Sequence, residues 1–566
     1  MGSIIRKKIK KRLYYYYVES KRINGKPKLV NQKYLGTAEK LLSIVLATDP
    51  SLQERVLYSD VSEFGAVTLL YDLASRLAMT ERIDEILPKR KQGASLGTYI
   101  LTAAINRAVA PRSTRGLEEW YASTVLPRIL GHQPSTFTPQ NFWNNTCIKE
   151  EDLRRMDDAI LSKIIATYDL DTSHLIYDAS NFFTYMDTNQ PSELAKRGHC
   201  KSKRNDLRIV GLSLMVSPDF SIPLLHETYP GNRHDASQFH RMLEQLKDRY
   251  EKISGRTTEI TLVFDRGNNS EASIKLLESG PLKFHYVGGL KKNQVNDLYQ
   301  VPRDHYRPLE APSLEGQTAY RVQREIYGRK MTVLMVHNPA LEKGQLQGIL
   351  IHREQITQKL LKLQQKLIQR ANGTLRKGKK PTKEGVTHAV ESLLKVEYMK
   401  ELFQYEVLEQ EGRLYLTFAF SEEALERLRQ EQLGKTALFT DRDDFSNETI
   451  LITYRSAWHI EASFRQMKDT DHLSVKPIFH WTDEKIRVHL FTCVLALRLC
   501  SLLQKELAGQ GIHLSINTML DDMSSIKKVT TFFGELDQPE KVLSFTQGNA
   551  TAQSIEKRYR LKEKYG

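Results

Sequence analysis

The sequence predicts a multidomain α/β protein, and three observations lead to this prediction. Helical periodicity dominates from about residue 38 to 170, whereas short apolar runs alternate with turn signals from residue 171 onward. Asn24 and Gly25 separate two runs rich in tyrosine and β-branched residues, which is a strong hairpin signal. At 566 residues the chain is too long for a single core, so we expect three or more domains.

The charge of the chain points to a polyanionic partner. The chain has 83 Lys and Arg against 68 Asp and Glu, a net charge of +15. This excess is concentrated in residues 1–40 and 351–383, where acidic residues are few. Nucleic acid is the partner that such a distribution favours, although either basic run taken alone is also typical of a solvated tail.

The remaining composition indicates a folded protein of a reducing compartment. Its four cysteines show no metal-ligand spacing, which predicts neither disulfides nor zinc. The N-terminus lacks the apolar segment of a signal peptide. The apolar run 488–503 is interrupted by Arg498 and is too short for a span, so we expect a buried core helix, no membrane association and a cytoplasmic location.

Two aspartates stand where predicted strands end. A strand-like run from His174 is expected to end near Asp178, and the buried run 259–264 ends at Asp265. Between them, residues 207–231 read as two strands joined by a turn; after them, residues 271–279 predict a helix and residues 283–290 another strand. Catalytic groups collect at the carboxyl ends of strands in α/β sheets, although either aspartate alone could be an ordinary cap.

Residues 291–448 interrupt this pattern. They combine strand-like runs at 318–337, 403–420 and 435–441 with an amphipathic helix at 351–370 and a basic loop at 371–385. The loop is rich in Lys and Gly and is the better candidate for contact with DNA.

The stretch 454–468 carries a third carboxylate. If it is helical, spacings of four and seven residues place one stripe of polar side chains on one face and apolar ones elsewhere. The polar stripe contains Tyr454, Glu461, Arg465 and Lys468, and the residues expected in the core are Ile460, Phe464 and Met467. The alternative is a surface helix with an ordinary Glu–Arg pair.

Three carboxylates without His or Cys are the ligands of hard cations. Asp178, Asp265 and Glu461 would hold Mg²⁺ or Mn²⁺, and two such ions can drive phosphodiester chemistry. Arg465 and Lys468 would then bind DNA phosphates beside the metal.

These residues also carry a resemblance to a known family. The stretch 454–468 resembles the Y-(2)-R-(3)-E-(6)-K signature of the insertion-sequence-four superfamily of bacterial DDE transposases, and especially of its 1634-type branch. Segments of the same family's aspartate regions are matched by LIYDASNFF, RGHCKSKRNDLRIVGLSLMV, YPGNRHDASQF and LVFDRGNNS. By motif, Asp178, Asp265 and Glu461 take the catalytic positions, and Tyr454 and Lys468 the signature tyrosine and lysine.

The resemblance implies an RNase H-like catalytic core split by a mostly β insertion domain. It further implies a homodimer on DNA that binds terminal inverted repeats and target DNA in the bacterial cytoplasm, associated with the nucleoid. The expected domains are a DNA-binding basic β-hairpin (1–37), a helical N-terminal region (38–170), the first part of the core (171–290), the insertion domain with its basic loop (291–448), the second part of the core (449–510) and a C-terminal region (511–566).

The chain departs from the signature at one position. The signature arginine is replaced by Ala457, and Arg455 or Arg465 would have to substitute for it. Arg266 and Trp458 are further candidates for DNA contact. None of the four tryptophans lies in 291–448, so hairpin chemistry does not follow from the resemblance. Two alternatives remain open: a non-catalytic, domesticated DNA-binding protein, and a metal-dependent nuclease without strand transfer.

Overall fold

The computed structural model divides into two compact units, which are described separately. The described residues are 2–9, 12–23, 26–37, 40, 56–187, 189–198, 204, 206–253, 259–279, 283–375, 378, 380–533 and 540–566. The first unit contains Met1–Thr80, Lys89–Asn145 and Gly511–Gly566, and the second contains Glu81–Pro88 and Thr146–Gln510. The predicted turn at 24–25, Cys200 and part of the basic loop 371–385 lie outside the described residues.

The N-terminal strands form a small antiparallel sheet. Its order is β1 (Gly2–Ile9), β2 (Arg12–Ile23) and β3 (Lys26–Gly36). The pairing of β2 with β3 confirms the predicted hairpin, and β1 adds a strand that was not predicted. The alternation of a strand places Tyr14 and Tyr16 on one face, where both rings meet Tyr34.

A second sheet of the first unit joins distant parts of the chain. Its order is β17 (Glu540–Phe545), β16 (Lys527–Phe533) and β4 (Val56–Glu63). The expectation of helix throughout 38–170 is therefore wrong at β4, which pairs with a C-terminal strand.

The helices between β4 and β5 are α3 (Gly65–Arg76), α4 (Met79–Ile86), α5 (Leu96–Val109), α6 (Leu117–Ala122), α7 (Leu126–Leu130), α8 (Pro139–Asn145) and α9 (Glu150–Tyr168). Those at the C-terminus are α20 (Ile516–Ser524), α21 (Ala550–Tyr559) and α22 (Leu561–Tyr565).

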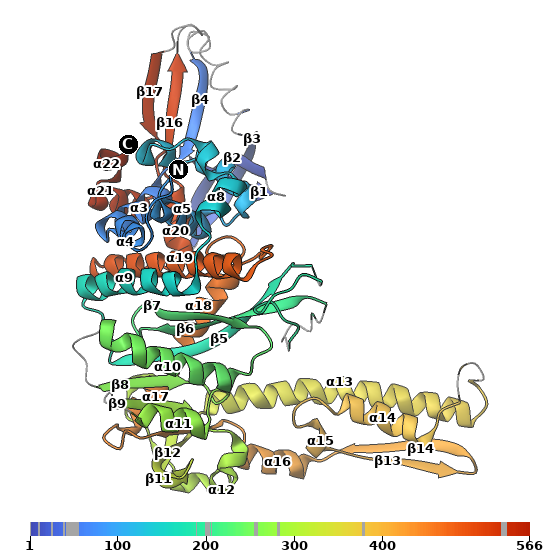
Figure 1. The fold of residues 1–566 in the computed structure, drawn as a ribbon. Helices are drawn as coiled ribbons and strands as arrows, with labels where there is room; N and C mark the ends of the chain where they lie inside the picture. The colour runs from blue at the N-terminus through green and yellow to red at the C-terminus, as the bar shows by residue number, and fades with distance from the viewer. Residues whose placement is uncertain are drawn as a thin grey trace. The chain divides into compact units, whose positions relative to one another are not determined.

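The second unit is built on a mixed nine-stranded sheet (Figure 1). Its order is β10-β11-β12-β15-β9-β8-β5-β6-β7. The strands are β5 (His174–Thr184), β6 (Arg208–Val216), β7 (Pro223–Pro230), β8 (Glu259–Phe264), β9 (Lys283–Gly289), β10 (Arg307–Pro308), β11 (Thr318–Ile326), β12 (Arg329–His337) and β15 (Lys435–Thr440). β8 runs parallel to both β5 and β9, and the other pairs are antiparallel.

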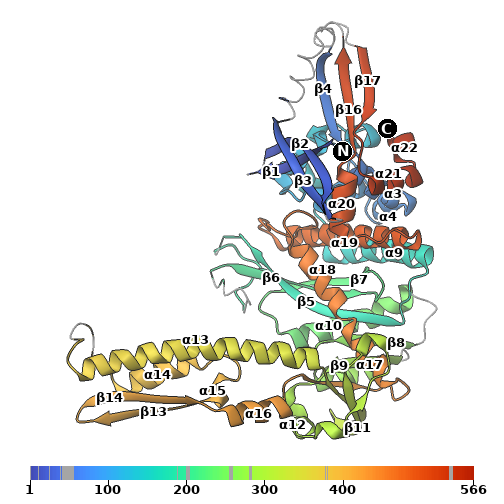
Figure 2. The same cartoon turned by 180° about the vertical axis from the view of Figure 1, so that it is seen from behind.

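Helices cover both faces of this sheet, which explains why its central strands read as continuous apolar runs. α10 (Asp235–Ile253) and α11 (Glu271–Glu278) lie on one face, where the ring of Tyr177 meets that of Phe239. α9, α17 (Asn447–Arg455), α18 (Trp458–Lys468) and α19 (Asp483–Gly509) lie on the other, where Phe182 meets Phe464. Figure 2 shows α17 and α18 crossing the face that is turned away in Figure 1.

The predicted core helix is confirmed as α19. It is long and apolar enough to cross a membrane. However, 94% of its most apolar stretch of 18 residues is buried within the protein. Its interrupting charge, Arg498, is fully buried and donates to Asp157 Oδ1 of α9 at 2.7 Å and to the Pro223 carbonyl at 2.7 Å. Burial raises the pKa of Asp157, but Arg498, His226 and Arg249 outweigh burial and hold this pKa well below its ordinary value. The pair therefore fixes α9 and α19 to each other and to β7.

The prediction of a mostly β insertion is wrong, because more residues of 291–448 lie in helices than in strands. An arm leaves the sheet after β12 and returns at β15. It contains α13 (Pro339–Ala371), α14 (Lys383–Leu393), α15 (Met399–Leu402), β13 (Phe403–Gln410), β14 (Arg413–Phe420) and α16 (Glu422–Glu431). α13 packs on the β13–β14 hairpin through a shared apolar core that includes Ile356, Leu360 and Leu416. β11, β12 and β15 belong to the main sheet and not to the arm.

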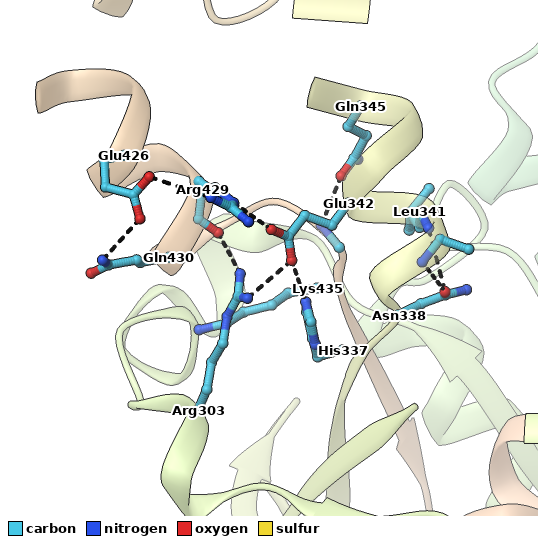
Figure 3. A network of polar contacts seen from close by, with 12 residues as sticks. Arg303, His337, Asn338, Leu341, Glu342, Gln345, Glu426, Arg429, Gln430 and Lys435 are labelled. Carbon is cyan, nitrogen blue, oxygen red and sulfur yellow. Dashed lines mark hydrogen bonds and ion pairs between the residues drawn. The ribbon is translucent and has the colours of Figure 1, made fainter. Parts of the chain in front are cut away.

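A buried carboxylate joins the arm to the sheet (Figure 3). Glu342, near the start of α13, is 6% exposed and accepts hydrogen bonds from Arg429 Nε at 2.7 Å and from His337 Nε2 at 2.7 Å. It also pairs with Arg303 Nη1 at 3.0 Å. Beside it, Lys435 donates to the carbonyls of Tyr299 at 2.6 Å and Val301 at 3.1 Å. The segment that enters the arm after β12 and the segment that returns at β15 are therefore both held by the contacts around Glu342 and Lys435.

Lys435, where the arm meets the sheet, makes the stability of the protein depend on pH. Burial lowers the pKa of Lys435 from its ordinary 10.5 to about 8. Between these values the unfolded chain binds a proton that the folded chain lacks, so Lys435 makes the free energy of unfolding rise as pH rises, by at most about 1.4 kcal/mol per pH unit.

Urea unfolding from pH 8 to 10 should show the stability of the wild type rising relative to that of Lys435→Met. Lys343→Met, at an exposed lysine of α13, should follow the wild type, and parallel curves for Lys435→Met would contradict this account.

Candidate active site

The two aspartates lie where β5 and β8 separate. The parallel register pairs Leu175 with Leu262 and Ile176 with Val263. Continued by two residues, this register sets Asp178 beside Asp265, and the alternation of strands puts both on the face that carries α17 and α18. Asp265 follows β8 directly, as predicted. The prediction that a strand ends near Asp178 is wrong, because β5 continues to Thr184 and only its pairing with β8 ends.

The stretch 454–468 is not one helix. α17 ends at Arg455 and α18 begins at Trp458, so Tyr454 and Glu461 belong to different helices. At the break the Ser456 hydroxyl donates to the Thr453 carbonyl at 2.6 Å, a local bond that competes with helix continuation. Within α18 the predicted sidedness is confirmed. Its apolar residues Ile460, Phe464 and Met467 are buried, and its polar residues Glu461, Arg465 and Lys468 are exposed.

Tyr454 still reaches the second aspartate across this break. Its hydroxyl donates to Asp265 Oδ1 at 3.1 Å, and the backbone N–H of Arg266 donates to the same oxygen at 2.7 Å. Burial raises the pKa of Tyr454, and the negative charges of Asp265 and Glu461 raise it further. The phenol therefore remains protonated at neutral pH and can act only as a donor toward the carboxylate. Among the described residues, no side chain or backbone N–H donates to the other oxygen, Asp265 Oδ2.

Gly289 makes room for this contact. A Cβ atom at position 289 would lie 2.7 Å from the Tyr454 hydroxyl and 3.3 Å from Cβ of Arg266. No side chain fits there unless Tyr454 moves, because its ring is rigid and partly buried. The carbonyl of Gly289 in turn accepts a hydrogen bond from the buried side chain of Asn269, four residues after Asp265.

Lys468 fastens the other end of α18 to the strand that bears Asp178. Its ammonium donates to Ser180 Oγ at 2.6 Å and lies 5.6 Å from the centre of the Phe182 ring. Ser180 and Phe182 follow Asp178 at intervals of two, so all three occupy the same face of β5. The signature lysine thus lies on the same strand face as the first aspartate, about 7 Å further along the backbone.

The structure places the other residues predicted to contact DNA in different surroundings. Arg455 donates to Gln317 Oε1, so the structure does not direct it toward Asp265. Arg465 is exposed on α18, and Arg266 is exposed beside Asp265. Trp458 is 60% exposed and stacks on the neighbouring His459 ring at 3.9 Å.

Sequence reasoning missed three residues that shape the site: Ser180, Asn269 and Gly289. The period of two along β5 gave a signal for Ser180, because it follows Asp178 on the same face. The glycine pair at 288–289 was visible but matched no phosphate-binding loop. Gly289 leaves space for Tyr454, which comes from a distant segment. The neighbouring sequence carries no pattern that predicts this role.

The site's fit to a metal ion is partial. Carboxylate oxygens without His or Cys suit a hard divalent cation, and both Asp265 and Glu461 are exposed. However, among the described residues no group of three or more His, Cys, Asp or Glu side chains is arranged to hold a metal ion. The donor types therefore fit, whereas the side chains are not gathered around one point.

Comparison with known proteins supports the assignment of this region. The profile of the transposase DDE domain matches residues 169–499, more than half of the chain. The chain belongs to the family of transposases with this domain. No curated protein matches it.

Two solved structures show distant similarity. The synaptic complex of piggyBac transposase with hairpin DNA has a TM-score of 0.38 and 9% identity, covering 83% of this chain and 82% of that one. The paired-end complex of Mos1 transposase with the left transposon end has a TM-score of 0.15 and 12% identity, covering 35% of this chain and 60% of that one. Neither transfers a residue role to this chain.

We predict that Gly289 and Tyr454 act as one unit. Tyr454→Phe removes the hydrogen bond to Asp265, and Gly289→Ala displaces the same hydroxyl. Each should slow DNA strand cleavage by about ten-fold, the cost of one hydrogen bond to a charged group. Because both lose the same interaction, the double variant should be no slower than either single one.

The matched control is Gly267→Ala, since a Cβ there meets open space two residues after Asp265. It should cleave at the wild-type rate. Additive losses in the double variant would show that Gly289 acts independently of Tyr454.

Proposed function

We propose that this protein is a DNA transposase that cleaves DNA at the ends of its element and joins the freed 3′-hydroxyls to target DNA. The observation that carries the proposal is the contact between Tyr454 and Asp265. It brings the Glu461 segment to the end of β8, although 189 residues separate the two partners. The register of β5 leads Asp178 to the same place.

We further propose that the second unit is an RNase H-like core split by the arm, as in the 1634-type branch of the insertion-sequence-four superfamily. The mixed sheet with parallel β5, β8 and β9 supports this layout. So does the return of the chain from the arm, through β15 and α17, onto the face that carries Asp178 and Asp265.

Asp178, Asp265 and Glu461 are the residues that would hold two Mg²⁺ or Mn²⁺ ions. When bound, such ions activate a water or a 3′-hydroxyl and stabilise the leaving oxygen of the phosphodiester. Tyr454 orients the carboxylate of Asp265, so that its second oxygen remains available. The exposed cations Arg465 and Lys468 bind the phosphates that flank the scissile bond.

DNA is the proposed partner throughout. The net charge of +15 supplies nonspecific attraction to the phosphate backbone. The β1–β3 sheet, with its basic sequence and the tyrosines gathered near Tyr34, is a proposed site for binding the terminal inverted repeats. Two copies would hold the two ends as a homodimer in the bacterial cytoplasm.

Two observations favour a second candidate function. The described residues contain no gathered metal-binding group, and Ala457 replaces the signature arginine. A non-catalytic DNA-binding protein that descends from a transposase would combine both features. A nuclease without strand transfer is the nearer alternative.

The three carboxylates test these functions directly. Asp178→Asn, Asp265→Asn and Glu461→Gln each remove one negative charge at nearly constant volume. With Mg²⁺, a labelled element end and a supercoiled plasmid, each should lower cleavage by more than about 100-fold. Binding to the end fragment should be retained, because phosphate contacts do not need these carboxylates.

Glu315→Gln, at an exposed position outside the site, should cut and join like the wild type. Cutting without joining by the wild type would leave the nuclease alternative, and binding alone would leave the non-catalytic one. Full cleavage by any of the three variants would refute its assignment.

Lys468 should behave as a phosphate contact. Lys468→Ala removes one cation, so the slope of log affinity against log salt should become shallower by about 0.9. Filter binding between 50 and 200 mM salt measures this slope. Lys275→Ala, on α11 at the opposite face of the sheet, should leave the slope unchanged. An unchanged slope for Lys468→Ala would remove this residue from the DNA contacts.

A further inference from the structure

Three exposed aromatic side chains form one surface beyond the proposed catalytic residues. We call it the aromatic surface; it consists of Tyr185, Phe479 and Trp481, which are 49%, 51% and 62% exposed. Large rings normally bury most of their area, so a cluster of exposed rings marks an interaction site more often than an isolated one does.

The backbone holds this surface in place. The segment after Val475 runs beside the end of β5, where Thr184 and Ile478 form a parallel bridge and the Tyr185 N–H donates to the Ile478 carbonyl at 2.9 Å. The rings of Tyr185 and Phe479 lie 5.2 Å apart. These contacts fix two of the three rings relative to the strand that carries Asp178.

Alternation along the extended segment explains why the rings face outward. Ile478 is buried, and His480 lies against the ring of His489 of α19 at 4.7 Å. The residues between and after them, Phe479 and Trp481, therefore point to the opposite side. Their exposure follows from the register of the segment and not from a loose loop.

A positive charge lies beside the rings. Lys476 is 5.7 Å from the centre of the Phe183 ring, and Phe183 precedes Tyr185 by two residues on the same side of the strand. On the other side of β5, Lys468 covers Phe182 in the same manner. Flat rings next to lysines are the combination that binds single-stranded nucleic acid, because bases stack on the rings and phosphates pair with the cations.

We propose that the aromatic surface stacks unpaired bases of DNA that runs past the end of β5. This inference rests on the proposed function and adds a binding site to it. Tyr185 follows Asp178 by seven residues, roughly 23 Å along an extended strand. This is the length of about seven base pairs of duplex, so the stacked bases belong to DNA flanking the scissile phosphate and not to the bond that is cut.

The test compares DNA binding by the full-length wild type and a Phe479→Ala, Trp481→Ala double variant. Fluorescence anisotropy in EDTA excludes cleavage. Three probes of equal length are used: a single-stranded oligonucleotide, the same strand with abasic sites, and the fully paired duplex. The variant should bind the single strand at least ten-fold more weakly, because stacking on an aromatic ring contributes strongly for each base. Duplex affinity should stay within about two-fold, and the wild type should bind the abasic strand as weakly as the variant binds the normal one.

Two further variants separate stacking from folding. Phe479→Tyr, Trp481→Tyr keeps aromatic rings and should retain most of the affinity. Tyr58→Ala removes a ring of similar exposure, 50%, in the other unit and should leave single-strand affinity unchanged. All variants should keep the thermal unfolding midpoint of the wild type, because the substituted rings are half-exposed.

Several results would overturn the proposal. Unchanged single-strand affinity would do so, as would an equal loss for duplex and single strand. Altered sedimentation of the variant with unchanged DNA binding would show instead that the surface contacts a second copy of the chain. The binding assay contains no metal, so its result does not depend on whether the protein cuts DNA. A protein that stacks unpaired bases selectively but does not cut DNA in the Mg²⁺ assay would support this proposal and refute the proposed function.

Discussion

The proposed site depends on one hydrogen bond between segments that are far apart in the sequence. The Tyr454 hydroxyl and Asp265 Oδ1 meet at 3.1 Å only because position 289 has no side chain. This contact ties α17 to the end of β8, and the Lys468–Ser180 contact ties α18 to β5. Two strands and two helices are thereby held in one arrangement, with the exposed Glu461 between the two contacts in the sequence.

The arm adds a large segment without disturbing this arrangement. It leaves after β12 and returns at β15, and these strands are neighbours in the sheet, with His337 opposite Lys435. The two crossings therefore need little extra backbone, and Glu342 stabilises both by accepting from His337 and from Arg429. A charge buried at this depth is stable only with such partners. The register of β12 with β15 is therefore continuous although the arm is inserted between them.

Local patterns predicted much of the second unit. β6, β7, β8 and β9 follow from apolar runs and turn signals, and the sidedness of α18 follows from a period of 3.6 residues. The break at Ser456 and Ala457 was missed, because alanine favours helix and a serine hydroxyl bonding backward leaves no distinct pattern. β5 was cut short at Asp178, since the polar residues that follow resemble a turn. The pairing of β4 with β16 and the meeting of Tyr454 with Gly289 are tertiary events that local sequence does not encode.

The central claim is that Asp178, Asp265 and Glu461 converge on divalent ions when DNA is bound. The most direct measurement is anomalous X-ray scattering from crystals of the protein with Mn²⁺ and an uncleaved DNA end. Our account predicts manganese peaks about 2.0–2.6 Å from the carboxylate oxygens of all three residues. Ordered DNA at the site with manganese bound elsewhere, or bound without one of the three carboxylates, would contradict it.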